Sequence, residues 1–363
     1  MELNRLLREN IKRMTAYSSA RDEYNDASSS MIFMDANENP FPNGLNRYPD
    51  PQHQAVKTEL SKIKGIDPSR ILLGNGSDEI LDLIFRAFCE PRKDMVITLP
   101  PTYGMYQVLA NTNDVELMNI SLLKEFQPNV KEIIQRQTSK TKLLFLCSPN
   151  NPTANSFDAI KIETLINEFQ GIVVIDEAYI DFSTQESWVN RLNEFPNLIV
   201  TQTFSKAYGL AAIRLGICYA SKDIIAVLNK IKPPYNVNQL TQEVALKAIQ
   251  NQQQRKKEMM TIVANRSLLA SELQKISFVK KIYPSDANFL LIQVDDAHLR
   301  YKQLIKKGIV VRNRSNQLLC KNCLRITVGT ANEHKALIKA INDLELSSQG
   351  FSKETILNAL WEA

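Results

Sequence analysis

The sequence predicts an α/β protein, with a large domain on a mainly parallel sheet and a smaller α+β domain at its C-terminal end. Three observations lead to this prediction. The chain has 363 residues, too many for one small core. Short apolar runs alternate with helix-like segments, which is typical of parallel strands covered on both faces. A double proline, Pro233-Pro234, then interrupts this alternation, and the residues after it have the mixed pattern of an α+β domain.

Five apolar runs are predicted to be buried strands of the large domain. They are residues 95–99, 143–148, 172–176, 198–204 and 215–220. Residues 159–169 between two of them have helical spacing. Residues 77–88 also have an apolar helical stripe, and Ser77 is a suitable N-cap for that helix.

After the double proline we expect a long helix from 239 to about 276. FVKKIY, NFLLIQV, GIVVR and LRITV are predicted strands, with helices at 297–307 and from 333. The expected division is an N-terminal arm (1–30), a large domain (31–232), a small domain (233–346) and a tail (347–363) resembling an added helix.

Composition excludes several classes of protein. Apolar residues make up 44% of the chain, charged residues 23%, and the net charge of +5 comes from scattered residues, so no nucleic-acid partner is expected. No apolar run approaches the about 20 residues of a membrane span, and the first residues have no apolar signal region. Five cysteines indicate a reducing compartment, and we expect the cytoplasm. Cys320 and Cys323 lack further ligands nearby, so no metal site is expected.

Polar side chains follow three of the predicted strands. Asn151 comes after residues 143–148, Asp176 and Tyr179 end or follow 172–176, and Lys206 follows 198–204. Ligands of open α/β sheets bind at the carboxyl ends of the strands. We therefore expect an amide, a carboxylate, a phenol and an amine to meet in one pocket.

Other catalytic motifs are absent. Asp176-Glu177 would suit an ATPase only together with a G-x-x-x-x-G-K-[ST] loop, which the chain lacks. Glu79 occupies the third glycine position of a dinucleotide fingerprint starting at Gly74, and no G-x-S-x-G elbow is present. The helix from Ser77 could bind a phosphate at its N-terminus or be an ordinary capped helix, and both interpretations stay open.

Together these groups are what pyridoxal 5′-phosphate (PLP) requires. A lysine, Lys206, forms a Schiff base with its aldehyde, and a carboxylate, Asp176, keeps its ring nitrogen protonated. Asn151 and Tyr179 can bind the ring oxygen, while the helix from Ser77, Ser205 and Arg214 can bind the phosphate. Lys206 has no acidic neighbour in sequence, which suits an amine that works in its neutral form.

The chain resembles the fold-type I PLP-dependent aminotransferases over roughly residues 14–345. The resemblance rests on YSSARDEY, DANENP, RYPDP, GNGSDE, PTYGMY, SPNNPT, DEAYIDF, FSKAYGLAAIRLG, GIVVR and LRITVGT. It implies a mainly parallel seven-stranded sheet sandwiched by helices. It also implies transfer of an amino group between L-histidinol phosphate and 2-oxoglutarate in histidine biosynthesis.

The resemblance also implies roles for single residues. Lys206, Asp176 and Tyr179 are the implied catalytic residues, and Tyr103 stacks on the cofactor ring. Ser77 and Asp78 join Ser205 and Arg214 at the cofactor phosphate. Tyr48 reaches that phosphate in a neighbouring subunit, which implies a homodimer with shared active sites.

Four residues are implied to contact the substrate. Arg312 and Arg325 bind its anionic end, because a guanidinium suits both a carboxylate and a phosphate. Tyr17 closes over the substrate phosphate, and Asn37 lies near the substrate.

Three alternatives remain open: an aromatic-amino-acid transaminase, a threonine-phosphate decarboxylase, and a regulator that binds PLP without turnover. The chain departs from the family pattern after N-P-T, where Ala154 replaces the usual glycine. We expect Asn155 to supply the positive φ one residue later.

Overall fold

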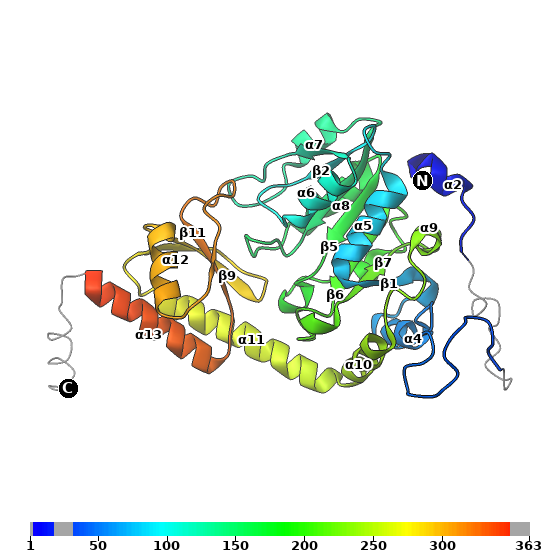
Figure 1. Cartoon of the computed structure of the whole chain (residues 1–363). Coiled ribbons are helices and arrows are strands. Elements are labelled where there is room, and N and C mark those ends of the chain that lie inside the picture. Colours follow the sequence, from blue (N-terminus) through cyan, green and yellow to red (C-terminus); the bar gives the residue numbers. More distant parts are fainter. Residues whose placement is uncertain (1–2, 18–31, 349–363) are drawn as a thin grey trace.

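The computed structural model describes residues 3–17 and 32–348 (Figure 1). Its large sheet has seven strands in the order β1-β7-β6-β5-β4-β2-β3. The strands are β1 (Ile71–Asn75), β2 (Met95–Thr98), β3 (Glu116–Asn119), β4 (Thr141–Cys147), β5 (Ile172–Asp176), β6 (Leu198–Thr203) and β7 (Leu215–Tyr219). Only β7 runs antiparallel to its neighbours, so the predicted mainly parallel seven-stranded sheet is confirmed.

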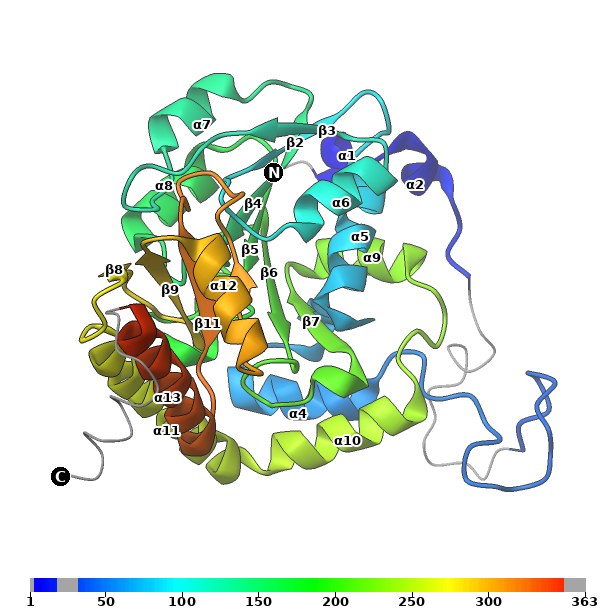
Figure 2. The same cartoon turned by 60° about the vertical axis from the view of Figure 1, so that its left-hand side comes forward.

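Helices cover both faces of this sheet (Figure 2). They are α4 (Gln54–Lys64), α5 (Gly76–Phe88), α6 (Met105–Thr112), α7 (Val130–Arg136), α8 (Ala159–Glu168), α9 (Lys222–Ile231) and α10 (Gln239–Gln250), with the short α1 (Leu3–Leu6) and α2 (Glu9–Arg13) before them.

Alternate residues of β5 enter different cores. Val173 and Ile175 pack with α4 and α8, whereas Ile172 and Val174 pack with α5 and α6. This explains the unbroken apolar run, because a strand buried on both faces has no polar side.

The second sheet is antiparallel, in the order β10-β11-β9-β8. It contains β8 (Val279–Ile282), β9 (Phe289–Val294), β10 (Arg312–Asn313) and β11 (Cys323–Thr327), and packs with α11 (Gln252–Leu273), α12 (Ala297–Lys306) and α13 (Ala331–Ser348). The smaller α+β part is therefore confirmed.

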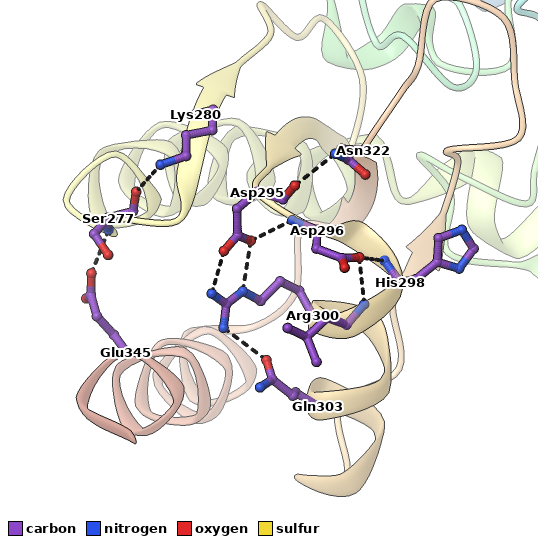
Figure 3. A network of polar contacts seen from close by, with 10 residues as sticks. Ser277, Lys280, Asp295, Asp296, His298, Arg300, Gln303, Asn322 and Glu345 are labelled. Carbon is purple, nitrogen blue, oxygen red and sulfur yellow. Dashed lines mark hydrogen bonds and ion pairs between the residues drawn. The ribbon is translucent and has the colours of Figure 1, made fainter. Parts of the chain in front are cut away.

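A polar network joins the helices to the strands of this smaller part (Figure 3). The Asp296 carboxylate accepts hydrogen bonds from the first N–H groups of α12 and caps that helix. The Arg300 guanidinium pairs with Asp295 just after β9, at 2.6 Å, and Glu345 of α13 accepts from the Ser277 N–H. These contacts hold the sheet and its helices in a fixed arrangement.

Three predicted elements differ from the structure. The helix expected over 239–276 is two helices that meet at Asn251, where non-helical backbone lets α10 pack on α4 while α11 continues to the second sheet. In GIVVR only Arg312 joins a strand, because Gly308 turns the chain with φ +79° after α12. The N-cap of α5 is Asn75 rather than Ser77, since Gly76 already belongs to the helix.

The division of the chain at residue 232 stays a prediction. Ala245 and Ile249 of α10 belong to the core that includes Val56 and Leu60 of α4. The tail from residue 349, and residues 18–30 of the arm, lie outside the described residues.

Candidate active site

A cavity of about 340 Å³ opens where β4, β5 and β6 end, beside the β10–β11 hairpin. It brings together all the predicted site residues except Tyr17, Asn37 and Tyr48. The lining consists of Ser77, Asp78, Tyr103, Cys147, Asn151, Asp176, Ala178, Tyr179, Thr203, Ser205, Lys206, Ala211, Arg214, Arg312, Arg314 and Arg325. The carboxyl ends of neighbouring strands thus meet at one edge, as the sequence predicted.

Asp176 is the buried carboxylate of this cavity, with 3% of its surface exposed. Burial raises its pKa to about 6, because the ionised form loses hydration. The Tyr106 hydroxyl donates to Asp176 Oδ2 at 2.9 Å, and the Ala178 N–H donates to Oδ1 at 3.2 Å. Both donors stabilise the ionised form and orient it toward the cavity. Sequence analysis missed Tyr106, because α6 brings it in from another element.

The neighbouring Glu177 points to a different set of groups. Its carboxylate accepts hydrogen bonds from the Ser187 hydroxyl (2.5 Å), the Trp188 N–H (2.7 Å) and Gln202 Nε2 (2.8 Å). It does not line the cavity. Of the two adjacent carboxylates, only Asp176 is therefore available for chemistry.

Lys206 lies partly buried in the loop after β6. Its Nζ is 5.6 Å from the centroid of the Tyr179 ring. Burial and the nearby positive charge of Arg325 lower its pKa, with Asp176 acting in the opposite direction. Within the described residues Lys206 forms no ion pair, so little holds a proton on this amine.

The start of α5 and Arg214 form an anion-binding corner of the cavity. Gly76 has φ +77°, and an added Cβ would lie 2.7 Å from Arg214 Nη2. A side chain at Gly216 would collide with the Ser77 amide nitrogen. Two glycines thus let the guanidinium, β7 and the free N–H groups of the helix come close together.

The two acidic residues in the first turn of α5 face different partners. Glu79 accepts from the Asn75 N–H and from Asn236, both at 2.6 Å, which directs it back over the helix start. Asp78 accepts from the Tyr103 hydroxyl at 3.0 Å and lies 3.7 Å from Arg214. Tyr103 is thereby fixed beside Asp176 in the cavity.

The loop after β4 presents Asn151 to the cavity. Asn151 Oδ1 accepts from Arg325 Nη1 at 2.5 Å, which joins the two sheets. The adjacent Asn150 is fully buried and holds the loop through Pro101 O and Thr153 Oγ1. The expectation for Asn155 was wrong, because Ala154 itself has φ +68°. Its buried methyl packs in a cluster with Tyr179 and Phe289, which offsets the backbone strain.

Three arginines besides Arg214 line the cavity. Arg312 of β10 is the cross-strand partner of Arg325 of β11. Arg314 follows two residues after Arg312 and lines the same cavity. Sequence analysis missed Arg314, because only the register of the two strands shows that it lies beside the others.

The remaining predicted residues lie elsewhere in the single chain. Asn37 and Tyr48 line a second surface cavity with Leu240, and the Tyr48 ring stacks on Tyr235 at 4.6 Å. Tyr17 is exposed. The single chain therefore does not bring these three side chains to Lys206.

The described part of the chain offers neither a metal site nor a membrane-spanning helix. No three His, Cys, Asp or Glu side chains gather there in a way that could hold a metal ion. No helix in the same part has both the length and the apolar character needed to span a membrane. The five cysteines are buried and unpaired.

Comparison with known proteins agrees with this geometry. The family model for aminotransferases of class I and II matches residues 33–341. A histidinol-phosphate aminotransferase of Christiangramia forsetii is 60% identical over 343 residues, which cover 94% of this chain and 98% of the relative. One of Flavobacterium johnsoniae is 58% identical over 341 residues, covering 94% and 98%. The crystal structure of histidinol-phosphate aminotransferase from Sinorhizobium meliloti in complex with pyridoxal-5′-phosphate has the same fold, with a TM-score of 0.75, 22% identity and 83% of each chain covered.

Proposed function

This chain belongs to the family of class I and II aminotransferases, and we propose that its Lys206 cavity transfers an amino group between L-histidinol phosphate and 2-oxoglutarate. The cofactor of this reaction is PLP. The observation that carries the proposal is the meeting of Lys206, Asp176 and Arg325 in one cavity. The substrate is proposed from the relatives with 58–60% identity, which act on histidinol phosphate by name.

The residues present fit PLP. The corner at Gly76 and Gly216 would be filled by any added side chain, and it offers Arg214 and free helix N–H groups to a phosphate. Asp176 is a buried carboxylate whose ionised form needs a cationic partner, which a protonated ring nitrogen supplies. Ser77, Ser205 and Arg214 would hold the phosphate, Tyr103 the ring face, and Asn151 and Tyr179 the ring oxygen. When bound, PLP supplies an aldehyde that takes up the amino group and a protonated ring that accepts electrons.

The protein groups have separate tasks in this scheme. Asp176, held by Tyr106, keeps a proton on the ring nitrogen. Lys206 moves a proton at the reacting carbon of the substrate, and its lowered pKa suits a base that must be neutral. Arg325 and Arg312 bind the anionic end of the substrate, so glutamate and L-histidinol phosphate can occupy the site in turn.

Tyr48 and Asn37 support a further part of the proposal, a homodimer with shared active sites. Both lie on a surface that also exposes the large apolar side chains of Leu45 and Leu240. A second copy covering this surface would bury it and carry Tyr48 toward the cofactor phosphate of its partner. Tyr17 would close over the substrate in the same assembly. We place the protein in the cytoplasm, which suits its five unpaired cysteines.

A substrate assay tests the function. The purified protein loaded with PLP should convert L-histidinol phosphate and 2-oxoglutarate to glutamate, measured against tyrosine and phenylalanine as amino donors. Release of carbon dioxide from O-phosphothreonine would indicate the decarboxylase instead. A clear preference for an aromatic amino acid would reject the proposed substrate, and binding of PLP without any turnover would support the regulator.

A further inference from the structure

We propose that Arg314 is a specificity-determining residue that binds the phosphate of the amine substrate and contributes little to binding glutamate. This inference rests on the proposed function. It concerns a residue outside the motifs that carry the family resemblance, found only through the shape of the β10–β11 hairpin.

The hairpin places three guanidinium groups at one cavity. Arg312 and Arg325 are directly opposite each other, and side chains two residues apart on extended backbone point to the same side. Arg314 is held in register by its own backbone, since its N–H donates to Cys323 O at 2.8 Å and its carbonyl accepts from the Gln317 N–H at 2.9 Å. The side chain therefore reaches the cavity from an anchored backbone.

The cavity gives Arg314 no protein anion. Among the described residues no carboxylate forms an ion pair with it, and its buried Nε has no hydrogen-bond partner. Burial, followed by the charges of Arg325 and Arg312, lowers its pKa to about 10. Three close cations without a carboxylate among them are unfavourable by themselves, and an anionic ligand would relieve both the repulsion and the unmet hydrogen bond.

Substrate chemistry distinguishes the arginines. In glutamate the α-carboxylate is bonded directly to the carbon that carries the amine, whereas in L-histidinol phosphate the phosphate is separated from that carbon by a methylene and an oxygen. Arg325 lies near the reacting end, because it contacts Asn151 and lowers the pKa of Lys206. Arg314 interacts instead with Arg325, Arg312, Cys320 and the Tyr179 hydroxyl, and it is not among the main charges that shift the pKa of Lys206. A phosphate reaches further from the amine and carries up to two charges, so it can engage a third guanidinium that a carboxylate does not need.

The two half-reactions of a transaminase test this separately. We would load wild-type protein, Arg314→Gln and Arg314→Lys with PLP and follow cofactor absorbance in single turnovers with L-histidinol phosphate or with glutamate. Arg314→Gln should raise the half-saturating concentration of L-histidinol phosphate roughly 10- to 100-fold and change that of glutamate by less than about threefold. Arg314→Lys should recover part of the loss. Arg136→Gln, which removes an exposed arginine paired with Glu132, is the matched control and should change neither value.

A second measurement uses inorganic phosphate as a competitor of glutamate in the same proteins. Its inhibition constant should rise about tenfold or more in Arg314→Gln. Equal weakening of both substrates, or no change in either, would overturn the role of Arg314. If wild-type protein does not react with L-histidinol phosphate, the proposed function fails, and the phosphate inhibition constant alone then decides whether Arg314 binds phosphate.

Discussion

The Tyr106 hydroxyl donates a hydrogen bond to Asp176 Oδ2 at 2.9 Å in a fully buried environment. The Tyr106 ring is itself fixed, since it stacks on Phe145 at 4.8 Å and meets Tyr103 edge to face at 5.6 Å. The carboxylate at the end of β5 is thus oriented by a side chain from α6 that has no direct access to a substrate. This arrangement makes Tyr106 a positioning residue.

Replacing Tyr106 by phenylalanine should impair catalysis without disturbing the core. The variant Tyr106→Phe keeps the ring contacts but loses a donor that favours the ionised form of Asp176, so the pKa of this carboxyl rises. We expect turnover at pH 7 to fall about tenfold, with a larger loss at pH 6 than at pH 8. The pH profile of kcat measures this. A loss that is the same at every pH would indicate a packing role only.

Asp176 should also make the protein freed of PLP sensitive to pH. Its pKa rises from 3.8 to about 6 on folding, so the folded state binds the proton more tightly. Binding of this proton adds to the free energy of unfolding, and the contribution is fully present below pH 4. It is lost as pH rises through about 6, and the total loss is up to about 3 kcal/mol.

The variant Asp176→Asn removes that dependence. Freed of PLP, it should have a higher free energy of unfolding than the wild type at pH 7, and the difference should shrink to about 1 kcal/mol near pH 4.5. Urea unfolding at the two pH values measures the difference. A variant that is less stable at pH 7 than the wild type would contradict the conclusion that burial destabilises the ionised Asp176 carboxylate.

Gly76 should be needed for cofactor affinity, in addition to the cost in stability that its positive φ imposes on any other side chain. In Gly76→Ala the new methyl would displace Arg214, because its position lies 2.7 Å from Nη2. We expect the dissociation constant for PLP to rise about tenfold or more. The control is Gly65→Ala, where φ is also positive (+66°) but no atom lies within 4 Å. It should destabilise the protein by about 1 kcal/mol and leave PLP affinity unchanged. Equal effects of the two variants on affinity would exclude the steric explanation.

Most of the large sheet could be predicted because its strands carry their own pattern. The first four residues of β5, residues 172–175, are all apolar, since alternate residues enter two different cores. Asn151, Asp176 and Lys206 each follow such a strand closely, so topology alone brings them together. Two strands of the sheet were not predicted, β1 (Ile71–Asn75) and β3 (Glu116–Asn119). The apolar part of β1 is only three residues long before Gly74, and the edge strand β3 contains no buried residue.

The parts of the site that sequence missed depend on contacts between distant segments. Tyr106 reaches Asp176 only because α6 packs beside β4, and Arg314 reaches the cavity through the pairing of β10 with β11. Ala154 shows a further limit. Its positive φ is tolerated because its methyl is buried against Tyr179 and Phe289, a compensation no local pattern reveals.

The shared active site of the proposed homodimer can be tested by mixing two inactive subunits. If Tyr48 acts in the neighbouring subunit, each active site takes Lys206 from one chain and Tyr48 from the other. Lys206→Ala and Tyr48→Ala then remove residues that different chains contribute to one site. Random exchange at equal amounts makes half of the dimers mixed, and each mixed dimer contains one intact site. Transaminase activity should therefore return to about one quarter of the wild-type value. A mixture of Lys206→Ala with Asp176→Asn is the control, and it should stay inactive because both residues line the cavity of one chain. If the first mixture also stays inactive while light scattering shows dimers that exchange, Tyr48 does not serve a neighbouring site.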